Sequence, residues 1–429
     1  MATAQAPTGY QMLDSPGLLG LLDALPEVRA RLGGRGPERW HIREVGDGNL
    51  NLVFIVEGPD GSVCVKQALP YVRAAGPSWP MPPDRAFFEH SYYAAVAPHV
   101  GGLIPQIYHY DSRRYCIVME RLSPHIILRH GLIGAHRYPR LARDLGEYVA
   151  CASFFTSDLA SPFERKMEAL ALFAANKALV RISVDLIFTD PYIRSARNRH
   201  TTPQLDALVG QLRRDSALKA AAARFGEKFL NQPQALLHGD LHSGSVMVTE
   251  QDSRVIDPEF AFYGPIGFDL GAFFGNLLLS WYSQPGHAGA GDDRATYQRW
   301  ILQQAAAFWE TFRHRFLALW AAHAHGDAYP TAMFTTLEDA AALAAARTAF
   351  VETLFADMLG FAACKMIRRI LGFAHVIDFE HIRDVGLRAR CEAGALAMAR
   401  LLLTQPQQFR SMVDVADAVP AMATGIELP

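Results

Sequence analysis

The sequence predicts an α+β protein of two lobes, in which a small β-rich N-lobe precedes a large, mainly helical C-lobe. Between residues 40 and 120, short apolar runs alternate with turns that contain glycine or proline, as in an antiparallel sheet. From about residue 139 the apolar pattern becomes helical. A chain of 429 residues can bury two sizeable cores. We therefore expect three parts: a helical lead at 1–36, a nucleotide-binding N-lobe at 37–122 and a C-lobe at 123–429.

The bulk composition excludes several functional classes. Half of the residues are hydrophobic and the net charge is −2, which is typical of a soluble globular protein and gives no sign of nucleic-acid or membrane-surface binding. The five cysteines are scattered, as expected for reduced thiols in the cytoplasm. The N-terminus lacks a signal-peptide pattern. The most apolar region, 340–367, is interrupted by charged residues, so we expect no membrane-spanning helix.

Five strands are expected in the N-lobe, at 40–45, 51–57, 62–67, 106–110 and 115–119. The turn after the first strand contains Gly46, Gly48 and Asn49, and such a turn can place backbone N–H groups over phosphates. The fifth strand ends in a linker with Met119, Glu120 and Leu122. Its backbone groups can face the edge of an adenine ring, so these six residues are candidate nucleotide contacts.

Lys66 and Glu89 form a candidate ion pair at the nucleotide. Lys66 closes the third strand, and Glu89 lies on a helix expected from Asp84, as its N-cap, to a stop at Pro98. A strand lysine that a helix glutamate orients can bind the α- and β-phosphates of ATP. Taken singly, however, Lys66 could equally well be a lysine that reaches solvent from a strand end, and a solvated surface position is the commoner fate of a lone glutamate such as Glu89.

The most informative stretch is residues 238–245, with the sequence HGDLHSGS. A short apolar strand leads into it, and another strand, at 254–256, ends in Asp257 and Glu259. This layout suits phosphoryl transfer, because Asp240 can accept a hydroxyl proton while Asp257 and Glu259 hold Mg²⁺. On extended chain, residues two apart face the same way. A surface role remains the alternative for Glu259.

Three more residues of this region are expected to support the loop structurally. His238 is expected to orient the loop, and Ser245 stands where a metal-holding asparagine would be expected. Asp269 has apolar neighbours and is expected to accept hydrogen bonds from the loop backbone, since a buried, unpaired carboxylate is costly. Long helices should complete the C-lobe; they are expected within 139–229 and at 270–282, 297–324, 337–371 and 387–403.

The ordered set of glycine turn, lysine, glutamate, linker and loop carboxylates predicts a protein-kinase-like bilobal fold. The chain resembles the aminoglycoside phosphotransferase and choline kinase group, whose loop reads His-Gly-Asp-x-x-x-x-Asn, and within it the 5-methylthioribose kinase family. The specific matches are serine at the end of that loop, the block 257–265 (DPEFAFYGP), the segments 66–73 and 78–80, and the paired arginines ahead of 375–380. The resemblance covers about residues 40–400.

The resemblance implies ATP- and Mg²⁺-dependent phosphorylation of the 1-hydroxyl of 5-methylthioribose in methionine salvage. It implies that Asp240 is the base, that Arg368 and Arg369 lie at the sugar or the transferring phosphate, and that the loop of Trp79 borders the site. On the residues alone, the arginine pair would be an ordinary surface ion pair. A homodimer is implied by resemblance only.

The sequence leaves two alternative functions open. One is a related kinase for another hydroxyl acceptor, such as an aminoglycoside, choline or homoserine. The other, from a different class, is a nucleotide-binding pseudokinase that acts as a partner module. The arginine pair argues mildly against cationic acceptors, and the presence of Lys66, Asp240 and Asp257 argues against a pseudokinase.

Overall fold

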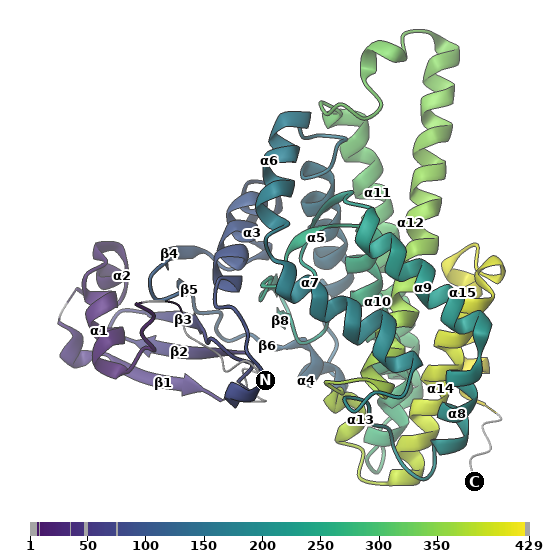
Figure 1. Cartoon of the computed structure of the whole chain (residues 1–429), viewed down its shortest axis with the longest axis horizontal. Helices are drawn as coiled ribbons and strands as arrows, with labels where there is room; N and C mark the ends of the chain where they lie inside the picture. The colour runs from purple at the N-terminus through teal and green to yellow at the C-terminus, as the bar shows by residue number, and fades with distance from the viewer. Residues whose placement is uncertain (1–6, 8, 35, 47–49, 74–75, 425–429) are drawn as a thin grey trace.

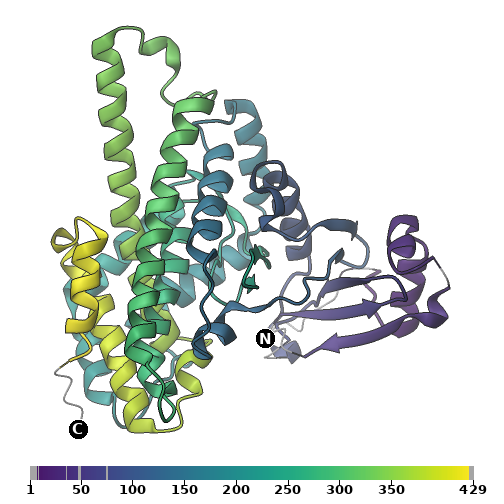
Figure 2. The same ribbon diagram turned by 180° about the vertical axis from the view of Figure 1, so that it is seen from behind.

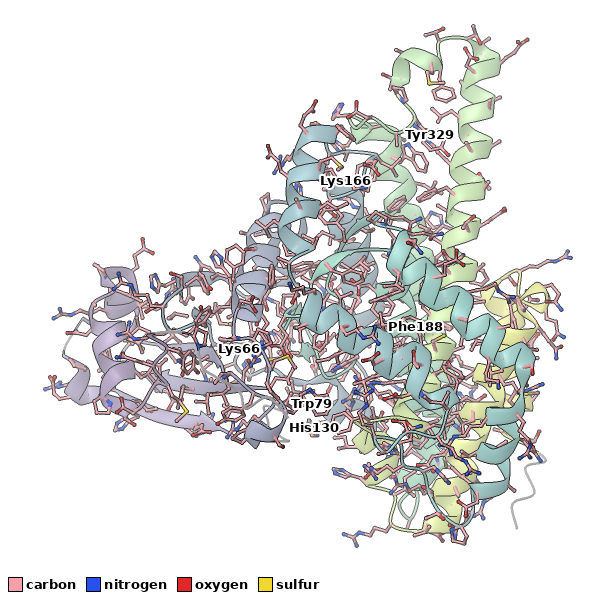
Figure 3. The ribbon with its side chains drawn as sticks, viewed as in Figure 1. Lys66, Trp79, His130, Lys166, Phe188 and Tyr329 are labelled. Carbon is pink, nitrogen blue, oxygen red and sulfur yellow. The ribbon has the colours of Figure 1, made fainter. Side chains whose placement is uncertain are left out.

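The computed structural model confirms the α+β architecture of two lobes and describes residues 7, 9–34, 36–46, 50–73 and 76–424. In Figure 1 the purple N-lobe lies to one side of the helices of the C-lobe. The strands of the N-lobe point toward the junction, where Lys66 and Trp79 are labelled in Figure 3. Within the described residues, no helix has the length and apolar character needed to cross a membrane.

The N-lobe is built on a five-stranded antiparallel sheet in the order β1-β2-β3-β5-β4. Its strands are β1 (His41–Val45), β2 (Asn51–Glu57), β3 (Ser62–Ala68), β4 (Ile107–Asp111) and β5 (Cys116–Glu120). Val63 and Val65 of β3 share a core with the lead helices α1 (Ser15–Asp23) and α2 (Pro26–Arg31). Because successive side chains of a strand alternate between faces, Lys66 faces away from this core.

Helix α3 (Arg85–Val100) connects the sheet to the C-lobe. Phe88, Tyr92 and Val96 are buried in the same hydrophobic core as the C-lobe helices. The hydroxyl of Tyr92 hydrogen-bonds that of Tyr148 at 2.6 Å. The helix that carries Glu89 is therefore fixed to the larger lobe as well as to the sheet.

The C-lobe is a helical assembly around α10 (Ile266–Ser283), every residue of which is buried. Helices α11 (Arg294–His323) and α12 (Leu337–Leu371) are the longest, and the start of α12, with the segment that joins it to α11, projects beyond the rest of the lobe (Figures 1 and 2). The remaining α-helices are α4 (Leu128–Ile133), α5 (Leu141–Phe155), α6 (Phe163–Phe173), α7 (Lys177–Ser183), α8 (Asp206–Arg214), α9 (Ser216–Asn231), α13 (Ile377–Glu380), α14 (Val385–Thr404) and α15 (Met412–Ala421).

Two small sheets carry the loops of the candidate site. Strand β7 (Ala235–Leu237) pairs with β10 (Phe262–Gly264), while β6 (Ile126–Ile127), β8 (Val246–Val248) and β9 (Ser253–Val255) form the other sheet. Residues 238–245, here called the HGD loop, join β7 to β8. Residues 256–261, here called the DPE loop, join β9 to β10. The two small sheets thus present both loops to the N-lobe.

The elements expected from the sequence are confirmed, and the range 337–371 matches α12 residue for residue. One expectation for α3 was wrong. Pro98 lies inside the helix, because a proline in the last turn removes only one N–H donor near an end that frays anyway. Asp84 is the N-cap residue, yet its side chain makes no capping hydrogen bond.

Candidate active site

The backbone of the HGD loop is fixed by a buried carboxylate and by close packing against the DPE loop. Asp269 of α10 accepts hydrogen bonds from the amides of His238 (2.7 Å) and Gly239 (3.0 Å). The His238 ring lies 2.9 Å from the carbonyl oxygen of Ile256, and burial lowers the pKa of this histidine. Gly239 has φ +82°, and a Cβ there would fall 2.2 Å from the carbonyl oxygen of Phe260. Only glycine allows the HGD and DPE loops to pack this closely.

Asp240 projects from this loop into a group of basic side chains. The ammonium of Lys365 donates to its Oδ1 at 2.7 Å, while His242 and Arg369 lie 3.3 and 3.8 Å from Oδ2. The Ser245 hydroxyl donates to the Asp240 carbonyl at 3.0 Å. Burial alone would raise the pKa of Asp240, but Lys365, His242 and Arg369 hold it well below its usual value. Asp240 is therefore an ionised carboxylate at neutral pH.

Three carboxylates converge at the junction of the lobes. Glu89 comes from α3, and Asp257 and Glu259 come from the DPE loop; one ligand oxygen from each lies within 4.8 Å of the others. Asp257 and Glu259 lie close together as expected, but the expected cause, an extended chain, was wrong. Asp257 has φ 71°, in the left-handed region, so a turn of the chain brings the two carboxylates together. We call these three residues the acidic cluster.

Lys66 is the first cation that compensates the acidic cluster. Its ammonium lies 2.6 Å from the Glu89 carboxylate and also forms an ion pair with Asp257. Burial would lower the pKa of Lys66, but Asp257, Glu89 and Glu259 raise it well above its usual value. Burial also raises the pKa of Glu89, and Lys66 opposes that shift. Lys66 thus remains charged and bridges the two lobes.

Arg85 is the second compensating cation, and sequence reasoning missed it because an arginine at the start of a helix carries no motif. Its side chain is 1% exposed and donates to Glu259 at 3.1 Å. The amide of Asn51 also donates to the same Glu259 oxygen, at 2.9 Å. The other acceptors of Arg85 are the Asn51 side-chain oxygen and the carbonyls of Leu50, Leu69 and Pro82. Arg85 therefore links strands of the N-lobe to the DPE loop.

The acidic cluster has the chemistry of a magnesium site. Its three carboxylates outnumber the two cations Lys66 and Arg85, and oxygen ligands are those that Mg²⁺ prefers. The Asp257 side chain is 44% exposed, whereas those of Glu89 and Glu259 are almost fully buried. Lys66 pairs with both Glu89 and Asp257, and Arg85 pairs with Glu259, so a metal ion at Asp257 and Glu259 would take the remaining oxygens of these carboxylates.

The residues expected at the nucleotide fall in two places. Gly46 follows β1, whereas Gly48 and Asn49 lie outside the described residues. The amide of Glu120 donates to the Gln106 carbonyl at 2.8 Å, and the Glu120 carboxylate accepts from the Gln106 amide at 3.0 Å. These bonds fix the start of the linker after β5. The remaining linker candidates, both buried, are Met119 and Leu122.

Helix α12 supplies the basic side chains near Asp240. Lys365 and Arg369 are four residues apart, so both lie on the helix face toward Asp240. Among the described residues, Nε and one terminal nitrogen of Arg368 are buried without a hydrogen-bond partner. The ring of Trp79 lies 5.1 Å from that of Phe373, just beyond the paired arginines. The structure thus brings the Trp79 loop and the arginine pair to one region.

Comparison with known proteins agrees with this geometry. The model of the phosphotransferase enzyme family matches residues 41–309, so the chain is a member of that class of enzymes. Methylthioribose kinase of Escherichia coli O45:K1 (strain S88 / ExPEC) is 45% identical over 96% of this chain and 98% of its own. Methylthioribose kinase 1 of Oryza sativa subsp. japonica is 44% identical over 95% and 94%. The chain belongs to the methylthioribose kinase family.

Among solved structures, the choline kinase of Cryptosporidium parvum Iowa II is similar to this chain, with 11% identity and a TM-score of 0.48. The match covers 95% of this chain and 99% of the choline kinase. The spectinomycin phosphotransferase APH(9)-Ia, solved with ADP and spectinomycin, is 13% identical with a TM-score of 0.41, over 96% and 99% of the two chains.

Replacing Arg85 tests whether it neutralises the buried part of the acidic cluster. The variant Arg85→Leu leaves Glu259 buried without its cation, so the free energy of unfolding should fall by about 3–5 kcal/mol. Arg143→Ala is the control, because Arg143 pairs with Glu147 on the surface and should cost less than about 1 kcal/mol. Urea denaturation measures both. Equal losses in the two variants would contradict this role for Arg85.

Proposed function

We propose that this chain transfers the γ-phosphoryl group of ATP to the 1-hydroxyl of 5-methylthioribose, giving 5-methylthioribose 1-phosphate and ADP in methionine salvage. The observation that carries the proposal is the identity of 41–45% with methylthioribose kinases over most of the chain. The site supports it, since an ionised carboxylate on the HGD loop lies across from a carboxylate-rich cluster at the lobe junction.

In this mechanism Asp240 orients the acceptor and takes its proton. The 1-hydroxyl oxygen attacks the γ-phosphorus, the bond from that phosphorus to the bridging oxygen breaks, and ADP leaves with that oxygen. The hydroxyl proton passes to Asp240. The low pKa of Asp240 makes it a weak base, which suits a loose transition state in which positioning contributes more than proton abstraction.

The other side of the site binds the nucleotide. In this mechanism Lys66, held by Glu89, contacts the α- and β-phosphates, and the linker after β5 faces the edge of the adenine ring. Asp257 and Glu259 would hold Mg²⁺. When bound, Mg²⁺ neutralises phosphate charge and orients the γ-phosphoryl group. Arg85 and Asn51 fix the orientation of Glu259 for this purpose.

The charge near Asp240 favours a neutral acceptor whose product is an anion. The basic side chains of Lys365, Arg368, Arg369 and Arg129 outnumber the nearby carboxylates of Asp240, Asp269 and Asp378, so this part of the site carries excess positive charge. A phosphate monoester gains from that charge, whereas a cationic acceptor such as an aminoglycoside or choline is repelled. 5-Methylthioribose is uncharged, which agrees with this arrangement.

The activity is tested with a panel of acceptors. With ATP and Mg²⁺, the purified chain should release ADP with 5-methylthioribose at least about tenfold faster, by kcat/KM, than with choline, homoserine or kanamycin. A coupled assay for ADP measures the rates. Turnover of another acceptor alone would replace the proposed substrate, and tight ATP binding without any transfer would favour a pseudokinase.

The role of Asp240 is tested by removing its charge. Asp240→Asn should lower kcat by about 10²- to 10⁴-fold, because the side chain can no longer accept a proton. ATP affinity, measured by calorimetry, should stay within about threefold of the parent chain. The control Asp417→Asn makes the same change at an exposed position on α15 and should have no effect. Near-normal turnover by Asp240→Asn would remove Asp240 as the base.

The oligomeric state and the cellular location of the protein can also be proposed. We propose a homodimer, on the resemblance to the family, and a cytoplasmic location, which the five free cysteines support. Sedimentation equilibrium should give a mass twice that of the 47.3 kDa chain at micromolar concentration. A mass of one chain under those conditions would contradict the dimer.

A further inference from the structure

Lys365 is a buried lysine that no sequence motif assigned to the reaction. Its side chain is 3% exposed, and its ammonium donates to Asp240 Oδ1 at 2.7 Å. The ammonium also lies 4.6 Å from the centre of the Phe268 ring, a cation–π distance. Lysine is almost never fully buried unless it is paired. The Asp240 carboxylate is the partner that makes this burial possible.

The position of Lys365 is fixed by the packing of α12 on α10. A Cβ on Gly271 of α10 would fall 2.6 Å from the carbonyl oxygen of Met358, and one on Gly275 would fall 2.9 Å from that of Ala362. The two helix backbones are therefore in direct contact in the turns beside Lys365. Since α10 also carries Asp269, which holds the amides of the HGD loop, one rigid helix pair fixes both the backbone and the side chain of Asp240.

The two oxygens of Asp240 have different surroundings. Oδ1 is held by Lys365, whereas Oδ2 has only His242 at 3.3 Å and Arg369 at 3.8 Å. Burial lowers the pKa of His242 to about 3, so its ring is neutral at pH 7. Further charged or titratable groups facing this region are Arg368 on α12, Arg129 on α4, Asp378 on α13, His238 on the loop and Asp269 on α10. Lys365 is thus the cation in direct hydrogen-bond contact with Asp240.

We propose that Lys365 is a positioning residue of the transfer, which keeps Asp240 an anion and reserves Oδ2 for the acceptor hydroxyl. This inference rests on the proposed function. During the reaction the hydroxyl proton moves to Oδ2, the acceptor oxygen bonds to the γ-phosphorus, and ADP leaves with the bridging oxygen. Lys365 keeps its proton throughout and bonds to neither substrate.

The consequence is a specific pH dependence. Burial raises the pKa of Asp240 and Lys365 is the largest influence that lowers it, so the parent chain keeps its base ionised well below neutral pH. Without Lys365 the folded-state pKa of Asp240 must rise. Protonated Asp240 cannot accept the hydroxyl proton, so activity is lost as the pH falls through that raised pKa.

The variant Lys365→Met tests this inference in the full-length chain. The acid limb of kcat/KM for 5-methylthioribose should move up by about 1–3 pH units, with partial recovery of kcat toward pH 9. The KM for ATP should stay within about threefold, because Lys365 contacts Asp240 and not the acidic cluster. Lys365→Gln, which keeps a hydrogen-bond donor without its charge, should show the same shift. Lys365→Arg, which keeps the charge, should restore the acid limb in part.

Lys228→Met is the matched control. Lys228 also pairs with a buried aspartate, Asp357 of α12, and also lies near a phenylalanine ring, that of Phe225 at 5.6 Å. Its loss should lower thermal stability and leave the acid limb within about 0.3 pH units of the parent chain.

Two outcomes overturn the inference. An unmoved acid limb in both uncharged Lys365 variants overturns it, as does an equal shift in Lys228→Met. If Lys365→Met does not fold, Lys365→Gln and Lys365→Arg decide it by the same pH profile. Absence of turnover in the parent chain would instead overturn the proposed function, so the two failures are distinguishable.

Discussion

The site depends on the ion pairs that neutralise three carboxylates at the lobe junction. Glu89, Asp257 and Glu259 could not lie so close together without Lys66 and Arg85, because like charges at short range repel and the burial of Glu89 and Glu259 is costly. The cations belong to the N-lobe side, while two of the carboxylates belong to the DPE loop. These ion pairs therefore join the two lobes, and the partly exposed Asp257 carboxylate is the one that an incoming metal ion can reach.

A second constraint organises the acceptor side. The glycines of α10 let α12 approach to backbone contact, and α10 and α12 together hold Asp240 through Asp269 and Lys365. The nucleotide side is thus built from ion pairs between lobes, whereas the acceptor side is built within the C-lobe core. This arrangement keeps Asp240 in place, since packed helix pairs resist deformation.

The fold could be predicted because its elements follow from local patterns. Alternating apolar residues and glycine turns predicted the sheet, and the helical period predicted α12 over its full length. Those residues of the candidate site that belong to sequence motifs were predicted. Arg85 and Lys365 were missed, because their partners lie 174 and 125 residues away and only tertiary packing brings them together. The turn at Asp257 was missed too, since a left-handed aspartate has no clear local signal.

The central claim is that the acceptor binds between Oδ2 of Asp240 and a γ-phosphoryl group held at the acidic cluster. A crystal structure with a non-hydrolysable ATP analogue, Mg²⁺ and 5-methylthioribose tests it most directly. The account predicts the 1-hydroxyl within about 3.2 Å of Oδ2, Lys365 still on Oδ1, and Mg²⁺ against Asp257 and Glu259. A hydroxyl bound away from Asp240, or one that displaces Lys365 from Oδ1, would contradict it.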